Sequence, residues 1–173
     1  TGIIACCLIG LAANTSAQDR GQYSEQDVKA AFIFNMIKFT DWPADYGGSS
    51  EKTLNVCVLG DDASAGLLRS IDGKIVRNKP ISVRHIDSIP QTKNCMVLFI
   101  ARSEQAKLKS VTSICMKANI LTIGDTEGYS EKGVIINLYK RDSKIRFQIN
   151  LSAMEKSGLK ISANVLKLAD ITR

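Results

Sequence analysis

Four short apolar segments, separated by segments of helical character, constrain the fold of this chain more than any other feature of its sequence. Leu54 to Gly60, Met96 to Ala101 and Ile120 to Ile123 are nearly continuous apolar runs, whereas Ile81 to Ile86 alternates apolar and polar residues. Continuous runs are typical of strands buried on both faces, and alternation is typical of a strand with one wet face. Strands that alternate with helices indicate a mostly parallel sheet covered by helices on both faces. We therefore expect a single α/β domain.

The segment from Glu25 to Phe39 is expected to form the first helix. Ser24 is a suitable N-cap, and the residue before Pro43 avoids helical backbone angles, which stops the helix. Its apolar residues occupy more than one face, as in a helix that is buried on several sides. The remaining expected elements are a short helix from Asp61 to Leu68, a helix from Glu104 to about Lys117 capped by Ser103, a C-terminal hairpin of Gly133 to Tyr139 and Lys144 to Leu151 joined by residues 140–143, and one or two helices between Ala153 and Ile171.

Residues 1–17 have the character of the end of a secretory signal peptide. They carry no charge, Ile3 to Ala13 is almost entirely apolar, and small residues precede an expected cleavage near Ala17. We expect residues 1–17 to be a truncated leader and 18–173 to be one domain in the periplasm. A buried N-terminal helix and lipidation at Cys6 are the alternatives.

The net charge of +6 is spread along the chain, with no long basic run. Because an exported protein does not routinely meet nucleic acid, we expect no nucleic-acid partner. A solvated surface is the preferred interpretation, and weak attraction to anionic lipid headgroups is the alternative.

Three cysteines remain after the leader: Cys57, Cys95 and Cys115. In an oxidising compartment two of them can pair. If Gly60 and Ala101 lie level in neighbouring strands, Cys95 lies about 10 Å beyond the level of Cys57, whereas a disulfide tolerates a Cα separation of about 7 Å. Either the strands are staggered or this pairing is wrong. Cys115 lies on an apolar helix face and is expected to be a buried free thiol.

The sequence shows no recognisable catalytic or metal site. Its only histidine, His85, has no second histidine or nearby cysteine, whereas zinc needs three or four ligands. No nucleophile elbow, phosphate-binding loop or dinucleotide fingerprint is present. We expect neither an enzyme nor a bound cofactor.

Polar residues follow three of the apolar runs, namely Asp61, Arg102 and Asp125. Ligands of open parallel sheets lie beyond the carboxyl ends of the strands, and Arg102 could hold an anion there. These three residues are candidate ligand-binding residues. The alternative is that they are ordinary caps and turns.

The ordered set of segments resembles the YfiR family of periplasmic proteins, over residues 25 to 170. The matching stretches are Val28 to Phe32, Phe39 to Pro43, Cys57 to Asp61, Cys95 to Ile100 with Arg102 and Ser103, Leu121 to Asp125 with Gly128 and Gly133, Ile136 to Leu138, and Ile145 to Leu151. The resemblance implies a periplasmic protein that represses an inner-membrane diguanylate cyclase by binding its periplasmic sensor domain, which lowers cyclic-di-GMP and biofilm formation. It also implies a disulfide between Cys57 and Cys95. A second disulfide of the family's namesake has no counterpart, because Cys115 has no mate.

Four aromatic residues are candidates for the contact with such a partner, namely Phe32, Phe34, Phe39 and Trp42, because they cannot all face one core. Core packing is the alternative for them. A small-ligand-binding protein that uses the strand-end crevice is the alternative function. A symmetric homodimer is the default expectation for the assembly.

Overall fold

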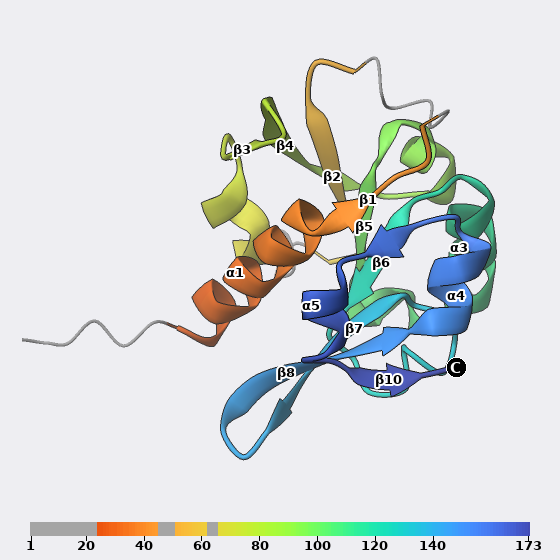
Figure 1. Ribbon diagram of the computed structural model, residues 1–173. Coiled ribbons are helices and arrows are strands. Elements are labelled where there is room, and N and C mark those ends of the chain that lie inside the picture. The colour runs from red at the N-terminus through yellow and green to blue at the C-terminus, as the bar shows by residue number, and fades with distance from the viewer. Residues whose placement is uncertain (1–23, 45–50, 62–65) are drawn as a thin grey trace, which may run out of the picture.

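The computed structural model describes residues 24–44, 51–61 and 66–173 (Figure 1). The expected leader, its cleavage near Ala17 and the lipidation of Cys6 lie outside the described residues, as does part of the expected helix from Asp61 to Leu68.

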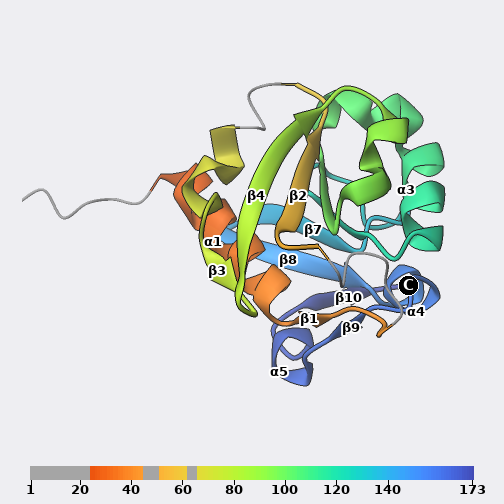
Figure 2. The same cartoon turned by 90° about the horizontal axis from the view of Figure 1, so that it is seen from above.

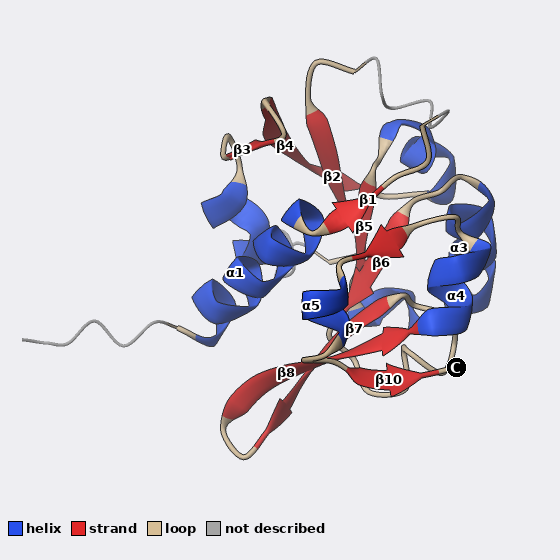
Figure 3. Ribbon diagram, viewed as in Figure 1, coloured by secondary structure: helices blue, strands red, loops and turns tan. Residues whose placement is uncertain are grey.

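An eight-stranded sheet forms the centre of the molecule, in the order β10-β8-β7-β6-β5-β2-β4-β3 (Figure 3). The five inner strands from β7 to β4 are parallel to one another, whereas β8 is antiparallel to β7, and β3 to β4. The expected α/β class with a mostly parallel sheet is confirmed. The strands are β2 (Leu54–Leu59), β3 (Ile75–Val76), β4 (Lys79–Ile86), β5 (Val97–Ile100), β6 (Leu121–Gly124), β7 (Ile136–Arg141), β8 (Lys144–Asn150) and β10 (Asp170–Thr172).

The two faces of this sheet support two apolar clusters. On one face, Val56, Val58 and Phe99 pack with the buried side chains of α1 (Glu25–Lys38). On the other, Cys57 and Leu98 pack with the buried side chains of α3 (Leu108–Lys117). Successive strand residues point to opposite faces, so the continuous apolar runs supply both clusters. Figure 2 shows α1 and α3 on opposite sides of the sheet.

The first helix begins and ends where its local sequence predicts. Ser24 and Asp27 form a capping box, in which the backbone N–H of Asp27 donates to the Ser24 hydroxyl at 3.1 Å and the Asp27 carboxylate accepts from Ser24. The helix ends at Lys38, and Thr40 already lies in the short strand β1 (Thr40–Asp41).

The helix expected after Ser103 differs in its first turns. The chain forms a 3-10 helix, η3 (Arg102–Lys107), before α3 begins at Leu108. Ser103 does not cap either helix, because its hydroxyl accepts a hydrogen bond from the backbone N–H of Asp61 at 3.2 Å. A contact between distant segments thus replaces the local cap that the sequence predicts.

The expected C-terminal hairpin is confirmed, with a tighter turn. Strands β7 and β8 pair down to Arg141 and Lys144, so only Asp142 and Ser143 form the loop, both with positive φ. Figure 1 shows the tip of this hairpin projecting from the rest of the molecule. Beyond it lie elements of which the sequence predicted only the helices, namely α4 (Leu151–Lys156), β9 (Lys160–Ile161), α5 (Ala163–Leu166) and β10. Strand β9 pairs with β1, outside the main sheet.

Candidate functional site

An open groove runs along the solvent side of α1. Its volume is about 610 Å³, and four of its lining residues are Val28, Ala31, Phe32 and Asn35. These positions are spaced i, i+3, i+4 and i+7, which places them on one stripe of the helix. Ser70 and Lys74, from the segment around η1 (Arg69–Ile71), form the opposite wall, and Asp27 of the first turn of α1 lies at the end of the groove. The groove therefore joins an apolar floor to a polar rim.

The polar groups of this rim differ in whether they are already satisfied. The Asp27 carboxylate accepts hydrogen bonds from the backbone N–H and hydroxyl of Ser24, at 3.2 and 2.6 Å. The Lys74 ammonium lies 5.3 Å from the centre of the Phe34 ring. Within the described residues, Lys74 makes no ion pair. The rim therefore presents a cation that has an aromatic neighbour and no acidic partner.

The structure separates the four aromatic candidates. Phe32 packs against Phe147, with ring centres 5.8 Å apart, while one side of it lines the groove. Phe34 and Trp42 are half-buried against the core under α1. Phe39 is the most exposed of them, at 43%, and Lys38 lies 5.8 Å from its ring centre. Phe39 is thus the most exposed of the four, and Phe32 contributes to the groove while it also packs against the core.

Ion pairs attach the N-terminal half of α1 to the carboxyl end of the sheet. Lys29 lies 3.0 Å from both Glu25 and Asp125, and Lys140 of the hairpin lies 2.8 Å from Glu25. Hydrogen bonds from Lys140 and Lys29 lower the pKa of Glu25 to about 2. Burial opposes the charge of Lys29, but its hydrogen bonds to Asp125 and Glu25 outweigh burial and raise its pKa. The network fixes the orientation of α1, and with it the groove.

Two of the three candidate ligand-binding residues lie together. Arg102 and Asp125 line one polar pocket of about 600 Å³ beyond the ends of β5 and β6, with Gln105, Thr126 and Glu127. Asp61 is not among the residues that line this pocket. Asp125 also forms the ion pair with Lys29, so only part of its carboxylate is available to a ligand.

The segments that follow β2 and β5 approach each other closely beyond the ends of these strands. The order reverses between β2 and β5, where Gly60 and Ser103 follow the two strands. A Cβ added to Gly60 would lie 2.5 Å from the Ser103 hydroxyl oxygen and 2.6 Å from the Ala101 Cβ. This close approach and the positive φ of residue 60 require glycine.

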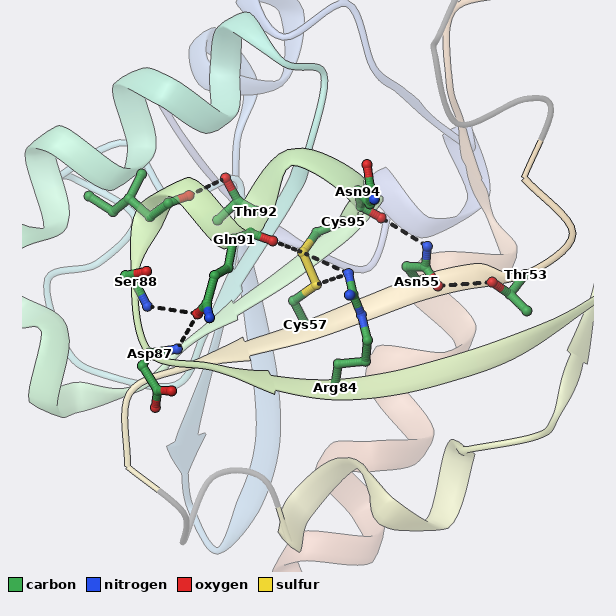
Figure 4. The surroundings of a disulfide bond; sticks show 11 residues. Thr53, Asn55, Cys57, Arg84, Asp87, Ser88, Gln91, Thr92, Asn94 and Cys95 are labelled. Atoms are coloured by element: carbon green, nitrogen blue, oxygen red, sulfur yellow. Dashed lines mark hydrogen bonds between the residues drawn. A yellow bond between two sulfur atoms is a disulfide. The ribbon is translucent and has the colours of Figure 1, made fainter.

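The disulfide between Cys57 and Cys95 is present, which confirms the pairing that the resemblance implies (Figure 4). Cys57 does lie level with Leu98 in the parallel register, so the two strands are not staggered. The Cα atoms of the cysteines are nevertheless 5.8 Å apart. Cys95 ends the 3-10 helix η2 (Ile89–Asn94) before β5 begins, and it joins Cys57 in one buried cluster. The chain approaches over the face of the sheet, a path that an extended-strand calculation could not anticipate.

Both disulfide sulfurs are covered by Arg84 of β4. Its Nη2 atom lies 3.7 Å from the Cys57 sulfur and 4.0 Å from the Cys95 sulfur (Figure 4). Cys115 is buried and unpaired, as expected, and burial raises the pKa of its thiol to about 12. A thiol with this pKa is a poor nucleophile at neutral pH.

The described part of the chain contains no group of three or more His, Cys, Asp or Glu residues that could hold a metal ion. None of its helices is both long and apolar enough to cross a membrane. His85 lies on the exposed side of β4, where its ring contacts the Gly60 carbonyl and its Nδ1 atom lies 3.5 Å from Asp87.

Sequence reasoning missed most of the groove. The stripe of Val28, Ala31, Phe32 and Asn35 was visible in the helical spacing, but an apolar helix surface does not reveal which part of it stays open. Ser70 and Lys74 carried no signal, because they reach α1 from a separate segment.

Two solved structures have a similar fold. A conserved domain protein from Vibrio cholerae O1 biovar El Tor has a TM-score of 0.59 at 12% identity, covering 83% of this chain and 60% of that one. The ABC domain in complex with L-Trp from Streptococcus pneumonia has a TM-score of 0.54 at 10% identity, covering 70% and 56%. This chain therefore matches less than two thirds of the length of either protein, and the likeness concerns the fold alone.

A family model described as YfiR/HmsC-like matches residues 26–170, which includes α1, both disulfide cysteines and the strand-end pocket. The match extends over most of the chain and agrees with the ordered motifs. The chain belongs to the YfiR/HmsC-like family.

Proposed function

We propose that this protein is a periplasmic regulatory binding protein that represses an inner-membrane signalling enzyme, a diguanylate cyclase, through its periplasmic sensor domain. Repression of this kind lowers cyclic-di-GMP and biofilm formation. Family membership supports the general part of the proposal, because the family is periplasmic and regulatory rather than enzymatic. A leader at residues 1–17 that is cleaved near Ala17, followed by one domain over 18–173, belongs to the same proposal.

The observation that carries the proposal is the open groove on α1. A regulator that works by binding needs an accessible surface that is not used for its own packing. The groove offers an apolar floor of Val28, Ala31 and Phe32 beside Lys74, which forms no ion pair with any residue that the structure describes, and the exposed Phe39 lies at the end of the same helix. Aromatic residues and apolar centres with a polar rim are typical of protein interfaces.

The disulfide between Cys57 and Cys95, with Arg84 beside it, is consistent with a protein that works in an oxidising compartment. Cys57 and Cys95 are both fully buried, and the bridge ties η2 to the central strand β2. Such a bridge persists in the oxidising compartments outside the cytosol.

Copurification from envelope extracts tests the proposal. The tagged wild-type protein should recover an inner-membrane protein with a cyclase domain, and deletion of its gene should raise cyclic-di-GMP. Recovery of no membrane partner, together with an unchanged cyclic-di-GMP level on deletion, would refute the proposal.

A second candidate function is the binding of a small polar ligand, favoured by the convergence of Arg102 and Asp125 on one pocket. Asp61 would contribute only from outside the lining of that pocket. A thermal-shift screen with periplasmic metabolites tests this function. A ligand should raise the Tm of the wild type and of Arg141→Ala, a variant at the hairpin tip, but not of Arg102→Ala. Equal shifts in all three proteins would place the ligand elsewhere.

A further inference from the structure

We propose that the α1 groove receives an acidic amphipathic helix from the periplasmic part of the partner. This inference rests on the proposed function and specifies the chemistry of the partner segment. Its occupant is a heterologous helix with apolar residues at i, i+3, i+4 and i+7 and at least one carboxylate that faces Lys74.

The shape of the groove favours a helix. Val28, Ala31 and Asn35 continue to Lys38 on the same side of α1, with spacings of three, four and three residues. The stripe from Val28 to Lys38 is about 15 Å long at 1.5 Å per residue. That length accommodates roughly three turns of a second helix. Packing of an apolar helix face into such a groove is a recurrent mode of recognition.

The charges along the groove determine the sign of the partner. Lys74 and Lys38 each lie over an aromatic ring, at 5.3 Å from Phe34 and 5.8 Å from Phe39. Neither takes part in an ion pair within the described residues. Phe34 and Lys38 are four residues apart on α1, so a carboxylate placed beside Lys74 would lie at the end of the helix that carries cations.

Asp27, the one acidic residue among the described residues that line the groove, lies at the N-terminal end of α1, seven residues before Phe34 and the Lys74 ammonium near it. Asp27 already accepts two hydrogen bonds from Ser24 within the capping box. Glu25, one turn away from Val28, is paired with Lys29 and Lys140. Asp27 keeps its negative charge, but it lies toward the other end of α1 from Lys74 and Lys38, where a carboxylate of the partner meets cations.

The open side of α1 is independent of the core. Ala31 and Asn35 are exposed, whereas Ile33 and Met36 of the same helix are fully buried. Substitutions at Ala31 and at the exposed Lys74 therefore change the groove without removing a core side chain. This separation allows binding and folding to be tested apart.

Photocrosslinking in the native cells tests the inference directly. Ala31 is replaced by photoreactive p-benzoylphenylalanine, and the crosslinked segment is identified by mass spectrometry. Ser113, an exposed residue of α3 on the other face of the sheet, is the matched control position. The expected result is an adduct at position 31, absent at 113, with a periplasmic segment that carries apolar residues at helical spacing and at least one Asp or Glu. An adduct with a second copy of this chain, or with a segment that lacks acidic residues, would overturn the inference.

Charge reversal at Lys74 provides the second readout. Lys74→Glu should reduce the yield of the adduct at position 31 roughly fivefold or more, whereas Lys74→Arg should retain it. Lys109→Glu, an exposed substitution on α3, is the control and should have no effect. An unchanged Tm establishes that each variant is folded.

The two hypotheses fail in different ways. If the wild type recovers a membrane partner and controls cyclic-di-GMP, but Lys74→Glu retains the adduct, the inference is wrong and the proposed function stands. If no partner is recovered and deletion leaves cyclic-di-GMP unchanged, the proposed function fails and the inference with it.

Discussion

At the scale of single residues, the disulfide between Cys57 and Cys95 depends on the local path of the chain just before β5. The two strands lie level, and the bridge forms because Cys95 precedes its strand and approaches over the face of the sheet. The two cysteines are 38 residues apart in sequence, so the bridge closes a loop that restricts the unfolded chain considerably.

Replacing both cysteines by alanine, as Cys57→Ala with Cys95→Ala, should lower the free energy of unfolding by about 4 kcal/mol, because the loop is no longer closed in the unfolded state. Urea unfolding under oxidising conditions measures the change. A reducing agent should destabilise the wild type by a similar amount and leave the double variant unaffected. Equal stability of the two proteins would show that the bridge does not contribute.

Glu25 predicts a pH dependence of stability. Its pKa in the folded protein is about 2, below its ordinary value of 4.5, so its ion pairs stabilise the fold fully above pH 4.5 and are lost as the pH falls toward 2. Because the side chain is 43% exposed, solvent screening limits the contribution to about 0.5–1 kcal/mol. Urea unfolding of Glu25→Gln at pH 7 and pH 2 measures it.

The deficit of Glu25→Gln should be present in full at pH 7 and much smaller at pH 2, where about half of the Glu25 carboxyl groups are protonated in the folded protein. Glu155→Gln, at an exposed position of α4, is the control and should show no such difference. A deficit of equal size at both pH values would mean that Glu25 acts through something other than its charge.

At the scale of elements, the contact between α1 and the end of β6 orients the helix whose outer side forms the groove. Lys29 and Asp125 are largely buried, with 16% and 24% of their side chains exposed, and they join segments 96 residues apart. Removal of one partner leaves a partly buried charge on the other, which costs more than loss of a surface ion pair.

A double-mutant cycle with Lys29→Met and Asp125→Asn measures this contact, and we expect a coupling free energy of about 1 kcal/mol. The pair Lys107 and Glu104, which lies within η3 and has an exposed lysine, is the control and should couple by less than about 0.5 kcal/mol. A coupling near zero for Lys29 and Asp125 would mean that the network does not hold α1 in place.

The elements that the sequence predicted correctly are those whose signal is local. The Ser24 cap, the apolar run of β2 and the β7–β8 hairpin follow from neighbouring residues. The 3-10 start before α3 depends on Ser103 reaching Asp61, and β10 depends on docking beside β8. Contacts between distant segments decide these elements, and no local pattern reports them.

The same distinction holds for the candidate site. Arg102 and Asp125 meet because the carboxyl ends of parallel strands share one edge, a rule that can be applied to a sequence. Asp61 is not among the residues that line their pocket, because that pocket lies beyond β5 and β6, whereas Asp61 follows β2. The groove could not be predicted from the sequence, because its outline depends on where Lys74 lies relative to α1, which only the folded structure shows.

At the scale of the whole molecule, one face of the sheet is covered by α3 and the disulfide-linked segment, and the other by α1. The first arrangement secures the fold. The arrangement on the α1 face leaves the outer side of α1 open. That side has an apolar floor, and its cations Lys74 and Lys38 form no ion pair with the residues that the structure describes. We propose that the two sides also differ in function: the α1 side binds a membrane signalling partner, and the α3 side does not.

Intracellular cyclic-di-GMP in cells that lack the gene tests this claim most directly, when the cells are complemented with matched variants. Deletion should raise the level, and wild-type protein or Ser113→Glu on α3 should restore it. Ala31→Glu should not restore it, because the new carboxylate adds a negative charge to a groove that is proposed to receive an acidic segment. Its Tm should be unchanged, since Ala31 is exposed. An unchanged level on deletion, or full restoration by Ala31→Glu, would contradict the account.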